Sequence, residues 1–344
     1  MDRRRTGRSL RSVAVGLAAL VAGALLPVAA QAQAADPYEW AALGDSYTAG
    51  LFIGQPQPAL GSPDRDGCDR TANSYPDLVQ RALNANPPGQ SVKLTDVSCG
   101  AAAIEHIADS SQKPISPVQA PADGWPEVAP QIERAALGET TDVVTIGVGG
   151  NTLGFADILT RCVSDGLFGR SCMNHYEYEI GQRYERVLNE YEAMLAAVHD
   201  AAPNAKVVTI GYPSVLPQNS EDCARGDLTE LATIGKSDTD WLWGVHANLN
   251  ELIKTVTDEF GDRFVDLAAS STGHDACQPA GTKWIEGICG PAADYWPTSI
   301  PLGEVGNLPC PEGTHTTLVH PNAAGHANSA KQVETAVRAA LQEL

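Results

Sequence analysis

Ser46 lies in a segment whose residue types suit a nucleophile. Gly44-Asp45-Ser46-Tyr47 follows an apolar run at residues 38–43. A glycine after a short strand lets the backbone turn sharply and leaves the serine at the strand's carboxyl end, where the active sites of open α/β sheets lie. Gly-Asp-Ser alone is also a good turn and a good helix N-cap, so this interpretation depends on partners elsewhere in the chain.

His320 is the candidate base for this serine. A serine nucleophile needs a base, a group that orients the base, and donors for the oxyanion of the tetrahedral intermediate. His320 stands in the segment LVHPN, where a proline follows it at the start of the last predicted helix. His315 and His326 lie nearby, and a zinc site of all three is the alternative, but spacings of five and six residues fit no common zinc site.

Two glycine-rich turns offer oxyanion donors. Gly100 follows a predicted strand, and a glycine there lets a backbone N–H approach a ligand closely. Asn151, in Gly-Gly-Asn after another strand, offers a side-chain amide worth about 3 kcal/mol in comparable sites, although the tripeptide is also an ordinary turn. Because Ser46, Gly100 and Asn151 all follow predicted strands, we expect them at one edge of the sheet.

Four separated blocks resemble, in chain order, those of the SGNH (GDSL) hydrolase family: Gly44-Asp45-Ser46, Gly100, Gly149-Gly150-Asn151 and His320. The resemblance runs from Ala41 to the final helix. It is closest to secreted actinobacterial esterases, lipases and phospholipases, whose segments are similar to GDSYTAG, VSCGGA and GGNTLGF. It implies that Ser46 is the nucleophile and His320 the base. It also implies an oxyanion hole made by the N–H groups of Ser46 and Gly100 and by the Asn151 amide.

The chain departs from the family pattern at two positions. Many members carry an aspartate three residues before the histidine, where this chain has Thr317. Some members of the actinobacterial branch orient the histidine with a main-chain carbonyl instead. We therefore predict a Ser46–His320 dyad in which the Thr317 carbonyl accepts from imidazole Nδ1. Thr152 replaces an aspartate of other branches and fits this one.

Regular elements of two kinds alternate along the chain. Apolar, β-rich runs predict strands at residues 40–43, 92–97, 142–148, 206–210 and 264–267. Helical periodicity predicts helices at residues 74–83, 184–199, 240–260 and 322–344. This alternation indicates an α/β fold with a mostly parallel sheet covered on both faces, and the resemblance implies a three-layer α/β/α sandwich with a five-stranded sheet.

The cysteines point to cross-linked loops. Long segments without predicted regular structure span residues 52–71, 107–125, 152–178 and 272–319, and they hold six of the eight cysteines. An even number of cysteines in an exported protein predicts four disulfides, although the number alone leaves their pairing open. The chain has no Cys-x-x-Cys pair, which argues against a structural zinc site. The resemblance implies Cys68–Cys99, Cys162–Cys172 and Cys223–Cys277, which leaves Cys289–Cys310.

The first 34 residues have the pattern of a secretory signal peptide. Five arginines precede an almost wholly apolar run at residues 13–30, and two small-x-small cleavage patterns follow it. A membrane anchor is the alternative. The chain carries a charge of −19, and removing a segment with a net +4 leaves −23, which disfavours binding to nucleic acid or anionic membranes. We expect a secreted, monomeric protein with a single domain at residues 35–344 and no stable membrane insertion.

The leading hypothesis is a serine esterase or lipase that hydrolyses carboxylic esters, with a small-molecule or lipid ester as substrate. An acyltransferase using the same acyl-enzyme is the second hypothesis. The third is a non-catalytic binding protein, against which the intact site residues argue. No metal or organic cofactor is implied. Apolar residues beside the site blocks are expected to form the acyl pocket, with core packing as their alternative role: Leu51, Phe52, Ile53, Leu153 and Phe155.

Overall fold

A parallel β-sheet organises the protein. The computed structural model describes residues 36–291 and 294–344. The sheet has the order β2-β1-β3-β4-β5, and every neighbouring pair is parallel. Its strands are β1 (Tyr38–Gly44), β2 (Val92–Asp96), β3 (Val143–Gly147), β4 (Lys206–Ile210) and β5 (Arg263–Val265). The prediction of a five-stranded parallel sheet is therefore confirmed.

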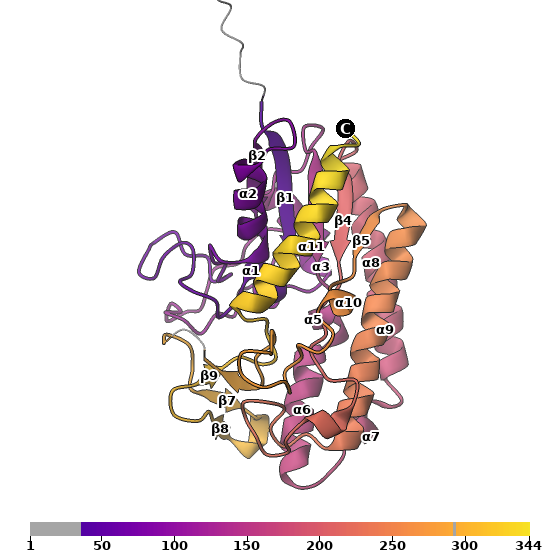
Figure 1. The fold of residues 1–344 in the computed structure, drawn as a ribbon. Helices are drawn as coiled ribbons and strands as arrows, with labels where there is room; N and C mark the ends of the chain where they lie inside the picture. The colour runs from indigo at the N-terminus through magenta and orange to yellow at the C-terminus, as the bar shows by residue number, and fades with distance from the viewer. Residues whose placement is uncertain (1–35, 292–293) are drawn as a thin grey trace, which may run out of the picture. The chain divides into compact units, whose positions relative to one another are not determined.

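Helices cover both faces of the sheet (Figure 1). The four that pack against the sheet are α2 (Tyr75–Ala85), α8 (Ile180–Ala201), α9 (Lys236–Phe260) and α11 (Ala323–Leu341). Side chains alternate along a strand, so Trp40 and Ala42 of β1 pack with α2 and α11. Ala41 and Leu43 pack with α8 and α9 on the opposite face. The three-layer α/β/α architecture follows from this alternation, and in Figure 1 the yellow α11 crosses the near face beside α2.

Further helices, turns and short strands lie in the segments that connect or follow the strands of the main sheet. The helices are α1 (Ser46–Ala49), α3 (Glu105–Ala108), α4 (Gln131–Arg134), α5 (Gly150–Leu153), α6 (Phe155–Leu167), α7 (Met173–Tyr176) and α10 (Leu267–Ser270). The 3-10 turns are η1 (Ser220–Asp222) and η2 (Gly303–Val305). Two small antiparallel pairs join β6 (Cys289–Gly290) to β9 (His315–Thr316) and β7 (Ser299–Pro301) to β8 (Asn307–Pro309).

The expectation of a loop at residues 152–178 is wrong. Most of this segment forms α6 and α7. Ile158, Leu159, Cys162 and Val163 lie at helical spacing and are buried, so an apolar helix face was present in the sequence despite the glycines around it. Leu267, which we expected at the end of a strand, instead begins α10.

Four disulfides join the loops as the resemblance implies. The pairs are Cys68–Cys99, Cys162–Cys172, Cys223–Cys277 and Cys289–Cys310. Each disulfide closes a loop and so restricts the chain entropy of the unfolded state.

Residues Asp36–Leu344 form one compact unit. The predicted signal peptide at residues 1–34 lies outside the described residues. Among the helices of the described part, none is long and apolar enough to span a bilayer.

Candidate active site

Ser46 is the first residue of α1, directly after β1. The turn requires Gly44, whose φ is 155°, because a Cβ there would lie 2.6 Å from the carbonyl oxygen of Gly147. Asp45 caps the helix by accepting from the Tyr47 N–H at 2.9 Å. A first-turn N–H has no acceptor inside its helix, and the Ser46 N–H finds none elsewhere in the described part of the chain.

His320 contacts the serine directly. Its Nε2 lies 2.8 Å from Ser46 Oγ. Its Nδ1 lies 2.8 Å from the Thr317 carbonyl oxygen and 3.0 Å from that of Leu318. Both carbonyls can only accept, so Nδ1 carries the proton and Nε2 presents its lone pair to the serine hydroxyl. Sequence reasoning pointed to the Thr317 carbonyl but gave no signal for Leu318.

The turn before His320 has a backbone that side chains rarely adopt. Leu318 and Val319 have φ values of 44° and 55°, and a β-branched residue in this region costs about 1–3 kcal/mol. Three hydrogen bonds hold the turn. Ile288 and Gly287 accept from the N–H groups of Leu318 and Val319, and Tyr47 donates its hydroxyl to the Val319 carbonyl at 2.6 Å. The histidine is therefore fixed to α1 as well as to its own loop.

Asn151 and Gly100 differ in what they can donate. The Asn151 amide gives one hydrogen to the Ala102 carbonyl at 2.9 Å, which leaves its second hydrogen for a ligand. The Gly100 N–H donates to the Cys68 carbonyl at 3.0 Å. That N–H is occupied, so the structure does not support Gly100 as an oxyanion donor.

The next N–H in this turn belongs to Ala101. Its N–H has no acceptor among the residues that the structure describes, and its φ of 61° is one that favours glycine. Segments of the VSCGGA type have a second glycine at this position. This chain has alanine there, which is a third departure from the pattern, so the sequence did not reveal that residue 101 adopts a backbone conformation that glycine favours.

A buried network ties the serine turn to the asparagine turn. The Tyr212 hydroxyl donates to the Asp45 carboxylate and accepts from the Gly150 N–H at 2.8 Å. Tyr212 follows β4, and Asp45 and Gly150 follow β1 and β3. A single side chain therefore sets the spacing between the residues that flank Ser46 and Asn151.

Burial shifts the ionisation of the groups around Ser46. Burial lowers the pKa of His320 to about 4, against the raising effect of the Leu318 and Thr317 carbonyls. Burial raises the pKa of Asp45 to about 7, although hydrogen bonds from Tyr212 and Tyr47 act in the opposite direction. His320 is thus a neutral base at ordinary pH.

Two cavities meet at His320. A pocket of about 70 Å³ reaches Ser46 and Asn151 and has apolar walls formed by Phe155, Leu159, Val215, Leu249, Leu318 and Val319. A groove of about 820 Å³ passes His320 on the side of Phe52 and Asn322. The two spaces differ in size and in lining, and His320 lines both.

The apolar residues singled out in the sequence divide between these spaces. Phe155 lines the small pocket, whereas Phe52 and Ile53 line the groove. Leu153 is fully buried, so it has the alternative role of packing in the core rather than lining a pocket. Leu51 packs beside Gly100.

The three neighbouring histidines do not form a zinc site. His315 contacts the Trp296 carbonyl through Nδ1, and His326 Nδ1 accepts from the Tyr75 N–H. With His320 engaged by Ser46, each imidazole has its own separate partner.

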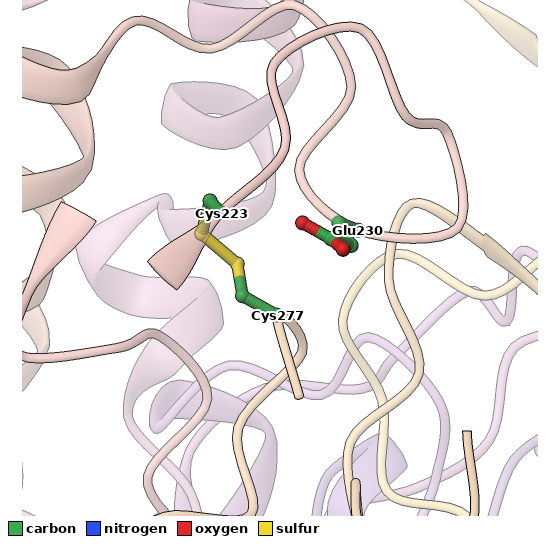
Figure 2. Close-up of side chains that lie close together, drawn as sticks. All are labelled: Cys223, Glu230 and Cys277. Carbon is green, nitrogen blue, oxygen red and sulfur yellow. A yellow bond between two sulfur atoms is a disulfide. The ribbon is translucent and has the colours of Figure 1, made fainter. Parts of the chain in front are cut away.

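A cluster of two cysteines and a glutamate also has no metal-binding chemistry. Figure 2 shows Cys223, Cys277 and Glu230 close together, with a bond joining the two sulfur atoms. A metal would need thiolates, and a disulfide has none. Glu230 instead accepts from the Ala224 N–H.

Comparison with known proteins gives consistent matches. The GDSL-like lipase/acylhydrolase family matches residues 42–327. Lipase 2 of Streptomyces coelicolor is 33% identical over 281 residues, which cover 79% of this chain and 84% of that protein. An esterase of Streptomyces scabiei is 30% identical in an alignment of 352 residues that covers 95% of this chain and 93% of that protein.

A solved structure shares the fold. Phospholipase A1 of Streptomyces albidoflavus superposes with a TM-score of 0.55 at 22% sequence identity, covering 88% of this chain and all of that one. Family and fold agree over most of the described residues, and the protein therefore belongs to the GDSL-like lipase/acylhydrolase family and is a carboxylic ester hydrolase.

Proposed function

We propose that the protein is a secreted serine esterase that forms an acyl-enzyme on Ser46 with His320 as the general base. The observation that carries this proposal is the 2.8 Å contact between His320 Nε2 and Ser46 Oγ, with Nδ1 held by main-chain carbonyls. Nucleophile, base and orienting group thus stand in one hydrogen-bonded row, as serine acyl transfer requires.

Acylation proceeds by addition and collapse. Ser46 Oγ attacks the ester carbonyl carbon as its proton moves to His320 Nε2, and the carbonyl oxygen becomes an oxyanion. The bond to the alcohol oxygen then breaks, and His320 returns its proton to that oxygen. Water repeats the cycle on the acyl-serine and releases the acid.

Three N–H groups near Ser46 donate hydrogen bonds to the oxyanion. We assign the Ser46 N–H and the second amide hydrogen of Asn151, and we replace Gly100 by the Ala101 N–H. The support is that these groups have no acceptor within the described residues, whereas Gly100 donates to Cys68. Donors fixed before the reaction stabilise the developing charge at no cost of reorganisation.

We further propose that residues 1–34 direct export and are removed. Four disulfides in the mature part support an oxidising destination. We infer that the enzyme acts as a monomer, because one chain supplies every group of the proposed site.

A covalent probe tests the function directly. Diethyl p-nitrophenyl phosphate should phosphorylate Ser46, which mass spectrometry of peptides locates. Ser46→Ala should lose the label and reduce the kcat for p-nitrophenyl acetate by about 10⁴-fold or more. Ser164→Ala, a partly exposed serine on α6 outside both cavities, is the control. Full activity in Ser46→Ala would overturn the proposal.

A further inference from the structure

We propose that this enzyme selects a short acyl chain, of about two to four carbons, esterified to a bulky alcohol that carries no phosphate. The inference rests on the proposed function and adds its substrate class. It assigns the small pocket to the acyl chain and the groove to the alcohol.

The chemistry decides which space takes which half of the ester. His320 must deliver its proton to the departing alkoxide, so the alcohol leaves on the side where His320 is open. The groove contains His320 but neither Ser46 nor Asn151. The small pocket contains Ser46 and Asn151, so it adjoins the carbonyl carbon and its oxyanion. The acyl chain therefore extends into the small pocket.

The size of the acyl pocket limits the chain. Its volume of about 70 Å³ is roughly half that of a cavity of about 150 Å³ that holds the six carbons of benzene. Leu159 and Leu249 in its walls are 1% and 2% exposed, so they belong to the packed core. Forcing additional methylenes into such a wall costs about 1–3 kcal/mol. A palmitoyl chain has no room there.

The groove suits a large alcohol. Its volume of about 820 Å³ falls within the usual range of ligand sites. Phe52 and Ile53 offer apolar contact, and Asn73 and Gln278 offer hydrogen bonds. This mixture fits an alcohol with several hydroxyl groups.

The charges of the groove exclude a phosphate. Asp227, Glu230 and Glu286 line it, against a single cationic side chain, Lys283. The Lys283 ammonium is buried and already donates to the carbonyls of Thr229 and Ala276. A phosphodiester would therefore lie near three carboxylates and find no free cation to bind. This repulsion disfavours substrates that carry a phosphate.

An ester series tests the acyl half. The substrates are p-nitrophenyl acetate, butyrate, octanoate and palmitate. Wild-type kcat/KM should peak at acetate or butyrate and fall by about tenfold or more at octanoate. Leu159→Ala should move the optimum to longer chains. Leu195→Ala, a buried leucine on α8 outside the pocket, should leave the optimum unchanged.

An optimum at octanoate or palmitate would overturn the inference while leaving the serine mechanism intact. Residual turnover in Ser46→Ala would instead overturn the mechanism.

A matched pair of substrates tests the alcohol half. Tributyrin and dibutyrylphosphatidylglycerol carry the same acyl group, and only the second carries a phosphate. Tributyrin should be hydrolysed with about tenfold higher kcat/KM or more. The double variant Glu230→Gln/Glu286→Gln should narrow this ratio, and its rate on p-nitrophenyl butyrate, measured in parallel, corrects for any general loss of activity. Equal rates on both substrates, or a ratio insensitive to the double variant, would overturn the phosphate exclusion.

Discussion

The serine side of the site is built on the parallel sheet, whereas the histidine side is built on a segment with little regular structure. Ser46 and Asn151 follow β1 and β3, which are hydrogen-bonded neighbours with Gly44 opposite Gly147. His320 follows residues 272–319, and in the described parts of that segment the regular elements are two-stranded pairs and one 3-10 turn. Backbone pairing positions the first side, and tertiary contacts with a disulfide position the second.

The difference has a physical consequence. Displacing a strand end would break a ladder of sheet hydrogen bonds, and the bonds of Tyr212 to Asp45 and Gly150 add to this support on the serine side. The histidine side depends on a few individual bonds, among them Tyr47 to Val319 and Cys289–Cys310. Substitutions that spare the catalytic groups should therefore affect activity mainly through the histidine side.

The largest expected effect comes from removing the base itself. His320→Ala should lower kcat for p-nitrophenyl butyrate by about 10⁴–10⁶-fold, because the serine loses its proton acceptor. His315→Ala, five residues earlier on β9, should retain near wild-type kcat. A His320→Ala enzyme within tenfold of wild type would remove the histidine side from the mechanism.

On the serine side, Asn151→Ala should lower kcat by about 10²–10³-fold through loss of one oxyanion donor. Asn151→Asp has nearly the same size and replaces the donor with an acceptor, so it should be worse than alanine. KM should change little in both variants, since the donor acts on the transition state. Equal activity in the two variants would show that the amide does not face the oxyanion.

The serine side is also the part that the sequence predicts well. Buried parallel strands give continuous apolar runs, and the residues at their ends share one edge, so Ser46 and Asn151 could be placed together. The sequence favoured Gly100 over Ala101, which we propose as the donor, because a residue type does not reveal which N–H groups are already hydrogen-bonded. That depended on the Cys68 carbonyl, which is distant in sequence.

The histidine side was less predictable. Thr317 was inferred from a missing aspartate, but the Leu318 carbonyl and the Tyr47 hydroxyl depend on tertiary contacts that leave no periodic signal. The size of the small pocket likewise depends on how α6 and α9 pack, and residues of α6 were expected to form a loop. Local sequence patterns predict helices and strands, whereas the size of a cavity depends on how those helices and strands pack together.

Removing a disulfide should separate the two sides further. Cys289→Ser/Cys310→Ser and Cys162→Ser/Cys172→Ser should each lower the free energy of unfolding by about 3 kcal/mol, since both open loops of moderate length. The first pair adjoins the strand before Thr317 and should also reduce kcat, whereas the second staples α6 to α7. Urea unfolding and kcat on folded protein measure both effects. Equal kcat losses in the two variants would contradict the contrast.

A smaller effect should follow from one hydroxyl. Tyr47→Phe removes the hydrogen bond to the Val319 carbonyl and leaves the ring beside His320, so kcat should fall about five- to tenfold for a loss of about 1 kcal/mol. Tyr184→Phe removes a similar bond to the Val245 carbonyl, far from the dyad in the chain, and should affect stability alone. If both variants keep full kcat, the turn is held without Tyr47.

The smallest effect is an expected constancy with pH. Burial lowers the pKa of His320 from 6.5 to about 4, so kcat/KM should stay level from pH 7 to about 5 and decline tenfold per unit below about 4. Because the folded protein binds this proton less readily than the unfolded chain, stability should fall as pH drops from 6.5 toward 4. Circular dichroism at each pH separates acid unfolding from titration of the base. A decline in kcat/KM centred near pH 6.5 with the fold intact would mean that His320 is solvated like a surface histidine, and the histidine side would then lack the enclosure that its contacts indicate.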